Sequence, residues 1–390
     1  MNSDHGNRAR ENHHGVDSID NGPVENPADA FVHVELALYD HFHDPDVEGA
    51  RAFYAALAAH GLRGAPVWTM LVAPPGCGKT ELINPLLGLP DVHLIDSITP
   101  NTLISGRAPE PNKPRGKDGL LERIGNNGMI FIPDFSTVLD GNRDKRGEIF
   151  SQLRRVYDGR LRKEFGIEGL NTEWSGRLTV GVAVTPEVDR HTAVFGSLGE
   201  RFLIIRWKRA GGIDAAITAM RQDTQAKDAA MRAAVKGLFD AMKLAPEPEL
   251  SVDLERAIAA TAELIACGRT PVRRERDENI EYVPEPEGAT RLAQQFCQLA
   301  KGSARLDSRA DVGASDLALV QRVAFDTLPP NRAAVLRATI NGQPLDVTGL
   351  KRHALRRAVE DLQQVDVLDA NRKLTPAMRQ VCATAGLLPM

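Results

Sequence analysis

A glycine-rich segment at residues 73–80, with the sequence Ala-Pro-Pro-Gly-Cys-Gly-Lys-Thr, limits the possible folds of this chain more than any other feature. An apolar run at residues 67–72 precedes it, and the helix-forming residues 81–83 follow it. Strand, glycine-rich turn, Lys-Thr and helix, in this order, indicate a phosphate-binding loop. In such a loop, backbone N–H groups and the positive end of the helix face phosphate oxygens. The segment therefore predicts a nucleotide site that directly follows a strand.

The residues of this loop have distinct predicted roles toward ATP and Mg²⁺. Lys79 is expected to reach the β- and γ-phosphates, and the Thr80 hydroxyl to ligate Mg²⁺. Ala73 stands where the motif usually has its first glycine. A chance glycine-rich turn is the alternative, but it would not explain the strand-like and helix-like flanks. The predicted nucleotide contacts are Pro75, Gly76, Cys77, Gly78, Lys79, Thr80 and Glu81.

Composition sets broad limits on the class of protein. The 390 residues are enough for about two or three domains, and 42% apolar residues support a sizeable core. Residues 1–30 hold six acidic residues and two arginines, which accounts for the whole net charge of −4. The remaining chain is balanced and shows no overall basic excess, so a surface that attracts nucleic acid would have to be local.

The cysteines and the apolar runs predict the environment of the protein. Four cysteines are scattered without paired spacing, which argues against a zinc site or a disulfide framework. A reducing, cytoplasmic location fits this pattern. The sequence has no run of 18 apolar residues and no hydrophobic segment at its start, so we expect no membrane partner.

Apolar patterns divide the chain into four predicted parts. Residues 1–28 are polar and are expected to form a disordered tail. Residues 29–210 combine helices, first at 29–62, with short strands, which predicts an α/β domain with a covered parallel sheet. Residues 211–328 are expected to form a helical lid with inserted helices, beginning with helices at 213–245 and 251–267, and an exposed loop at 269–287. Residues 329–390 form a small terminal unit. The five expected strands are 67–72, 92–95, 129–132, 178–184 and 202–205.

The strand at 129–132 ends in a candidate metal ligand, Asp134. In enzymes with a phosphate loop, such a carboxylate holds Mg²⁺ together with the loop hydroxyl. An Asp that only caps the next turn is the alternative. ATPases of this type usually have Glu at the following position to activate water, whereas this chain has Phe135. Hydrolysis is therefore expected to be slow, or to use another carboxylate; Asp140 and Glu148 are near in sequence.

Two further polar residues adjoin predicted strands. Thr185 ends the strand at 178–184, where its side chain could contact the γ-phosphate or the attacking water; a simple turn is the alternative. Arg201 precedes the last strand, where an arginine can serve the nucleotide of a neighbouring subunit. A surface salt bridge is the alternative for Arg201.

Together, the loop, Asp134, Thr185, Arg201 and the helices that follow resemble the AAA+ ATPases. The segment 160–177 resembles the β-hairpin that one AAA+ group inserts before its fourth strand; this group includes minichromosome-maintenance helicases and enhancer-binding activators. The resemblance implies a five-stranded parallel sheet and a ring-shaped homo-oligomer, with a hexamer among the options. It also implies that Arg291, in the helix starting near residue 289, is a lid arginine for the γ-phosphate. A solvated Arg291 is the alternative. Residues 96–106 and 133–137 also resemble uncharacterised ATPases of phages and mobile elements.

The last 60 residues resemble a winged helix, with helices at 332–340 and 350–362 and a small wing at 365–374. Nine basic and five acidic residues in 331–390 give a local charge of +4. The middle of the helix-turn-helix is shortened relative to that pattern. Arg356 and Arg357 here, and Arg162 and Lys163 in the hairpin, are the predicted DNA contacts.

Three functions remain open from the sequence. The first is an ATPase that couples Mg-ATP binding and hydrolysis to binding or remodelling DNA. The second is a nucleotide-gated switch that remodels an unknown protein partner, with weak hydrolysis and no DNA contact. The third is a transcription regulator that uses the terminal unit. A Gly-Ala-Phe-Thr-Gly-Ala loop is absent from the sequence, which argues against the sigma-factor-contacting type.

Overall fold

The five predicted strands form one parallel sheet, as expected. The computed structural model describes residues 27–105, 119–164, 171–191, 201–208 and 211–388; the predicted tail at 1–28 falls almost wholly outside these ranges. The sheet has the order β2-β3-β6-β1-β7, with every neighbouring pair parallel. All carboxyl ends therefore lie at one edge. The strands are β1 (Trp68–Val72), β2 (Val92–Leu94), β3 (Asn127–Ile132), β6 (Arg177–Val184) and β7 (Phe202–Arg206).

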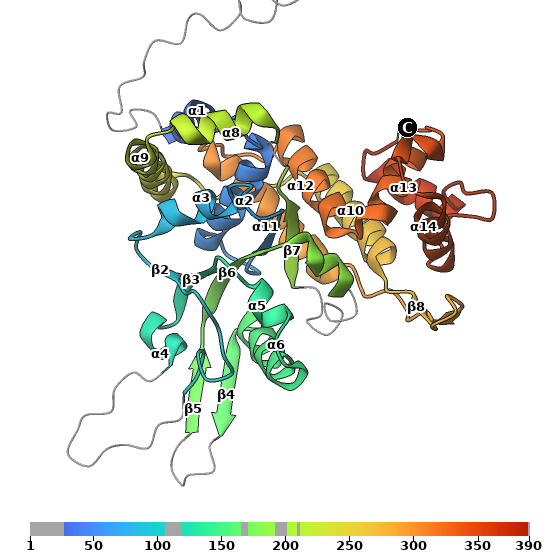
Figure 1. Cartoon of the computed structure of the whole chain (residues 1–390), viewed down its shortest axis with the longest axis horizontal. Helices are drawn as coiled ribbons and strands as arrows, with labels where there is room; N and C mark the ends of the chain where they lie inside the picture. Colours follow the sequence, from blue (N-terminus) through green and yellow to red (C-terminus); the bar gives the residue numbers. More distant parts are fainter. Residues whose placement is uncertain (1–26, 106–118, 165–170, 192–200, 209–210, 389–390) are drawn as a thin grey trace, which may run out of the picture.

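Both faces of the sheet are apolar, because successive residues of a strand point to opposite sides. Leu71 and Phe131 belong to one buried cluster, and Met70 and Ile132 to the other. Figure 1 shows α2 and α11 on one side of the sheet, and α5 and α6 on the other. The first layer contains α1 (Ala30–His41), α2 (Val47–Ala58), α10 (Val252–Arg269), α11 (Thr290–Leu306) and α12 (Ala314–Thr327). The second contains α4 (Leu120–Ile124), α5 (Ser136–Leu139) and α6 (Arg143–Tyr157).

The turn between α1 and α2 is held by a buried carboxylate. Asp46 accepts hydrogen bonds from the backbone N–H of Gly49 at 3.1 Å and of Lys208 at 2.9 Å, and it pairs with Arg322 at 2.5 Å. Burial alone would raise the pKa of Asp46, but these donors lower it below its ordinary value. The N-terminal helices are thereby attached to the segment after β7 and to α12.

The segment 211–328 is helical, as predicted, but its first helix is split. α8 (Ile213–Arg221) and α9 (Thr224–Leu244) are separate, because Gln222 is extended and the Asp223 side chain caps α9 by accepting from Gln225 and Ala226. The loop expected at 269–287 contains a small antiparallel pair, β8 (Arg273–Arg274) and β9 (Ile280–Tyr282). Within the described ranges, no helix has both the length and the apolarity needed to cross a bilayer.

The predicted hairpin is present. β4 (Arg160–Glu164) pairs antiparallel with β5 (Asn171–Ser175), between α6 and β6, and projects away from the sheet (Figure 1). Its expected turn at Gly166–Gly169 lies outside the described residues.

The terminal unit is almost entirely helical. It consists of α13 (Pro330–Ile340), a short 3₁₀ turn (Leu345–Thr348), α14 (Arg352–Gln364) and α15 (Pro376–Thr384). The expected wing is reduced to one bridge between Leu368 and Leu374, and α15 was not predicted. Val335, Leu336 and Leu362 belong to the same hydrophobic cluster as α1 and α2, so this unit is packed onto the rest of the protein.

The contact between α2 and α11 requires a glycine. A Cβ atom on Gly302 would lie 2.0 Å from the carbonyl oxygen of Ala55, which no side chain can tolerate without moving the helices apart. Gly147 in α6 offers the opposite case, since a Cβ there would meet nothing within 4 Å.

We predict that Gly302→Ala lowers the free energy of unfolding by about 1–3 kcal/mol, because it overpacks this contact. Gly147→Ala should instead raise it by about 0.5–1 kcal/mol, because alanine favours a helix interior. Denaturant titration of both variants measures these changes. Equal behaviour of the two variants would contradict the assigned helix contact.

Candidate functional site

The glycine-rich loop follows β1 and leads into α3 (Lys79–Ile83). Gly76 and Gly78 have φ angles of +73° and +82°, which side-chain-bearing residues rarely adopt. A Cβ on Gly76 would meet nothing within 4 Å. Glycine is therefore needed here for the backbone conformation rather than for space. This conformation is the one that the sequence motif predicts for a loop whose N–H groups turn toward an anion.

Lys79 lies over its own loop. Its ammonium donates hydrogen bonds to the carbonyl oxygens of Ala73 at 2.5 Å and Pro74 at 3.0 Å. Burial lowers the pKa of Lys79, while the neighbouring side chains of Cys77 and Asp134 counteract this effect. Asp134 is thus close enough to Lys79 to act on its charge. A phosphate group bound in the loop would offer the ammonium a stronger acceptor than a carbonyl oxygen.

Asp134 and Thr185 lie at the same edge of the sheet as the loop. The Asp134 carboxylate accepts from the Ser136 N–H at 3.1 Å, and the Ser136 hydroxyl accepts from the Thr185 N–H at 3.3 Å. The backbone N–H of Ala73 donates to Val184 at 3.3 Å. These bonds connect the segments that follow β1, β3 and β6. Asp134 and Thr185 therefore lie beside the start of the glycine-rich loop, whose last residues are Lys79 and Thr80.

The oxygen donors of this edge fit Mg²⁺. Thr80 and Asp134 are both exposed, and hydroxyl and carboxylate oxygens are the donors that this ion prefers. Within the described ranges, no three His, Cys, Asp or Glu side chains form a metal cluster. Magnesium in nucleotide sites is commonly held by one or two protein oxygens together with phosphates and water, so a small protein donor set suits that ion.

Phe135 faces away from the candidate site. Its side chain is fully buried and stacks on Phe150 with ring centroids 6.4 Å apart. The carboxylates considered from sequence do not replace it. Glu148 pairs with Lys163 of the hairpin at 3.1 Å, and Asp140 ends α5. A residue that sequence reasoning missed is Asp96, which is exposed and follows β2. The last pair of β2 with β3 is Leu94 opposite Phe131, and Asp96 follows Leu94 by two residues.

Arg201 and Arg291 lie near the amino ends of the strands, at the end of the sheet opposite the loop. Arg201 comes before β7, pairs with both carboxylate oxygens of Asp158 at 3.1 Å, and lies 5.4 Å from the Tyr157 ring centre. Its side chain is only 8% exposed. Arg291 is in the first turn of α11, where it pairs with Glu287 at 4.0 Å.

The two arginines are close to each other rather than to the phosphate loop. Burial raises the pKa of Tyr157 to about 12, and the charges of both Arg291 and Arg201 act against this rise. One turn after Arg291, the Gln295 amide donates to the Arg201 carbonyl at 2.7 Å. The cluster lies near the amino end of β1, where Tyr157 contacts Trp68, whereas the loop follows the carboxyl end of this strand. In this conformation neither arginine lies at the loop of its own chain, and each pairs with a carboxylate of the same chain, which for Arg201 is the ion-pair alternative.

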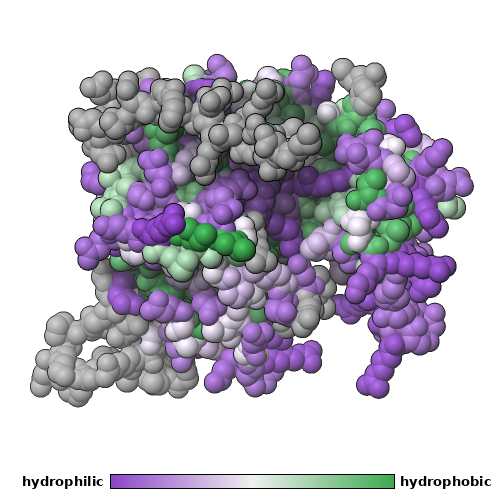
Figure 2. Space-filling view, turned by 45° about the horizontal axis from the view of Figure 1, so that its top comes forward, coloured by the Kyte–Doolittle hydropathy of each residue, from purple (hydrophilic) through white to green (hydrophobic). Residues whose placement is uncertain are grey.

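The four predicted DNA contacts do not form one surface. Arg162 and Lys163 are on β4, and Arg356 and Arg357 are on α14, which Figure 1 shows in different parts of the molecule. Each has an acidic partner within the chain: Glu164 at 2.8 Å, Glu148 at 3.1 Å, Glu360 at 3.5 Å and Glu278 at 3.3 Å, respectively. Figure 2 shows hydrophilic side chains interrupted by hydrophobic ones across the visible face. The basic charge is thus locally compensated.

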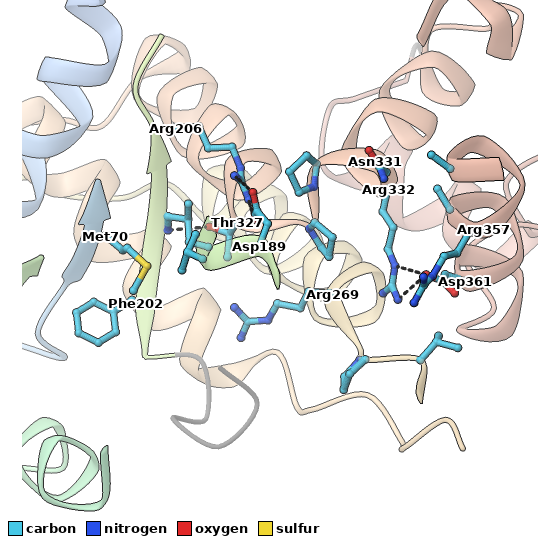
Figure 3. A pocket seen from close by; sticks show the side chains of 18 of the residues that line it. Met70, Asp189, Phe202, Arg206, Arg269, Thr327, Asn331, Arg332, Arg357 and Asp361 are labelled. Carbon is cyan, nitrogen blue, oxygen red and sulfur yellow. Dashed lines mark hydrogen bonds and ion pairs between the residues drawn. The ribbon is translucent and has the colours of Figure 1, made fainter. Parts of the chain in front are cut away.

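A cavity of about 630 Å³ lies between β7 and the terminal unit (Figure 3). Met70, Phe202 and Ile204 contribute apolar wall, and five arginines also line it. Each arginine has a carboxylate partner: Asp158 for Arg201, Asp189 for Arg206, Glu287 for Arg269, Asp361 for Arg332 and Glu278 for Arg357. This cavity is separate from the phosphate loop and contains none of Lys79, Thr80, Asp134 and Thr185.

The start of α9 also contacts the loop region, which the sequence did not indicate. Lys227 pairs with Glu81 at 2.6 Å, and its ammonium lies 5.9 Å from the centre of the Phe42 ring. The carboxylate of Glu81, a predicted nucleotide contact, is therefore engaged by another helix. A lysine in an alanine-rich helix carries no local sign of such a contact.

Comparison with protein-family models gives no match, and comparison with curated proteins gives none either.

We predict that Asp134→Asn leaves the protein folded, because the side chain is exposed, and weakens Mg²⁺-dependent nucleotide binding by about 10- to 100-fold. Nucleotide affinity should be measured over a series of Mg²⁺ concentrations, with Asp240→Asn on α9 as the control. An unchanged Mg²⁺ dependence, or loss of the folded state, would exclude the assigned role.

Proposed function

We propose that this protein binds Mg-ATP at the carboxyl edge of the sheet and hydrolyses it slowly. The observation that carries the proposal is the convergence of the left-handed glycines, Lys79, Thr80 and Asp134 at one edge. Ligands of open α/β sheets bind at this edge. In such a site Lys79 would stabilise the terminal phosphates, Thr80 and Asp134 would hold Mg²⁺, and Thr185 would orient the γ-phosphate or the attacking water.

The proposal extends to membership of the AAA+ ATPases and to a homo-oligomeric state. It is supported by the sheet with its adjoining hairpin and helices, and by the location of Arg201 and Arg291 at the edge away from the loop. An arginine so placed acts on a nucleotide only if a neighbouring subunit presents its loop there. Arg201 would have to leave Asp158 to do so, and Arg291 is the more exposed of the two, with 35% of its side chain accessible.

Slow hydrolysis favours a switch over a motor. Because Phe135 is part of the core, position 135 cannot supply a carboxylate to the water without repacking. Asp96 is the carboxylate that we propose as the general base, acting from the end of the neighbouring strand. A site in which ATP persists is suited to holding a bound conformation, so a nucleotide-gated switch acting on a protein partner is the second candidate.

Coupling to DNA is the remaining part of the proposal. The residues available for it are Arg162 and Lys163 on the hairpin, and Arg356 and Arg357 at the start of the winged-helix-like α14. Their acidic partners must be displaced or shared when phosphates bind, which lowers the gain from each contact. DNA contact is therefore expected to be weak at physiological salt.

We predict that Lys79→Ala removes the thermal stabilisation caused by Mg-ATP. At about 100 times the dissociation constant, bound ATP should contribute about 2.7 kcal/mol to the free energy of unfolding. Melting curves with and without Mg-ATP measure this, and Lys236→Ala, which removes an exposed lysine of α9, is the control. A Lys79→Ala protein that keeps the full shift would exclude the loop as the site.

We predict that DNA binding is detectable at low salt with ATP present and falls steeply as salt rises. Each lost phosphate contact should reduce the slope of log affinity against log salt by about 1. Comparing the double variants Arg162→Gln/Lys163→Gln and Arg356→Gln/Arg357→Gln shows whether the hairpin or the terminal unit contacts DNA. Substitutions are preferred to truncation of the terminal unit, because truncation would expose the shared core. Absence of binding at low salt would favour the protein-directed switch.

A further inference from the structure

The ion pair between Glu81 and Lys227 joins the phosphate loop to a helix about 145 residues away in the chain. Glu81 directly follows Thr80, and its Oε2 lies 2.6 Å from the Lys227 ammonium. The Lys227 side chain is 8% exposed, whereas that of Glu81 is 31% exposed. A lysine so enclosed is retained only with a partner, because removing an ammonium from water is costly unless another group compensates its charge.

Contacts around this pair hold three segments against the loop. The Lys227 ammonium lies over the Phe42 ring, and a Cβ on Gly78 would lie 4.0 Å from that ring. The Gln222 amide, just before α9, donates to the carbonyl of His41. The Tyr54 hydroxyl of α2 donates to the Leu82 carbonyl at 3.1 Å. The end of α1, α2 and the start of α9 thus contact the loop region and α3.

Glu81 by itself opposes the binding of a polyphosphate. Its carboxylate is on the residue next to Thr80 and two residues from Lys79, so it repels phosphate groups held by the loop. Lys227 compensates this charge from the side of α9, and its ammonium lies closer to Glu81, at 2.6 Å, than to its neighbour Asp228, at 3.6 Å. A bound triphosphate carries more negative charge than a monophosphate, so the benefit of this cancellation increases with the number of phosphates.

We propose that Lys227 is a positioning residue that neutralises Glu81 and so adapts the loop to nucleoside triphosphates. This inference rests on the proposed nucleotide site and adds to it a residue from α9. The charge of Lys227 acts on the nucleotide through Glu81, and the pair transmits the state of the loop to the start of α9.

The test compares Lys227→Met with Glu81→Gln in the full chain. Lys227→Met leaves an uncompensated carboxylate and should weaken Mg-ATP binding about tenfold, which corresponds to about 1.4 kcal/mol. The loss should be smaller for Mg-ADP and smallest for AMP. Glu81→Gln keeps the backbone at this position, removes the repelling charge and should raise Mg-ATP affinity. The double variant should recover affinity relative to Lys227→Met, and Lys227→Arg should behave like the original protein.

A purely structural ion pair gives a different result. It would make Lys227→Met and Glu81→Gln weaken Mg-ATP binding equally, and the double variant would not recover; either outcome overturns the proposal. An effect of Lys227→Met that is the same for ATP and AMP overturns it as well. Because Glu81→Gln has its own predicted sign, the proposal stays testable if Lys227→Met fails to fold.

Two controls separate this inference from the proposed function. Lys236→Met removes a lysine from the exposed face of α9, where it pairs with Asp240, and should change neither affinity nor its dependence on phosphate number. Lys79→Ala tests the nucleotide site itself. If the original protein binds Mg-ATP and Lys79→Ala does not, the proposed site holds and the Lys227 series decides the inference alone. If the original protein does not bind Mg-ATP, both are overturned.

Discussion

The parallel pairing of β1 with β6, and of β6 with β3, is the constraint on which the candidate site depends. Val182 of β6 lies between Met70 of β1 and Ile132 of β3. This register brings the ends of the three strands to a common edge, where Ser136 connects Asp134 to Thr185. The glycines of the loop can then adopt left-handed conformations without loss of sheet pairing, because they lie just beyond the last paired residue of β1.

Local patterns were enough to predict the elements that form the site. The five strands are short apolar runs, and both faces of the sheet are covered, so the runs contrast clearly with their polar flanks. The loop and Asp134 could be found because their chemistry is tied to their position directly after a strand. The split between α8 and α9 was missed, because Gln222 and Asp223 include neither glycine nor proline and the surrounding alanines favour a continuous helix. The terminal unit was predicted with a wing, but only one bridge forms around residues 368 and 374.

Long-range charge pairing could not be predicted from the sequence. The nearest carboxylate partners of Arg201, Lys227 and Arg322 come from segments far away in the chain. No local spacing indicates these partners, unlike the i,i+4 pair of Arg356 with Glu360. The same limit applies to function. Five arginines around the cavity beside β7 suggest an anion site if they are counted alone, but each one pairs with an acidic residue of this chain. Charge balance within the folded chain, rather than the number of basic residues, determines whether a surface attracts an anion.

Charge balance at the phosphate loop has a mechanical consequence as well. Lys227 is in the first turn of α9, four residues after the Asp223 cap. A movement of Glu81 would therefore displace the start of α9 through this ion pair. Just before that point is α8, which has no buried residue and exposes 79% of Ile213 and 78% of Met220. A helix with so little buried surface has little to hold it in one position. Its orientation therefore depends mainly on the segments at its two ends, and one of these ends is attached through Gln222 and Lys227 to the residues that surround the loop. The junction of α8 and α9 is therefore the point at which this exposed helix is joined to the residues around the loop.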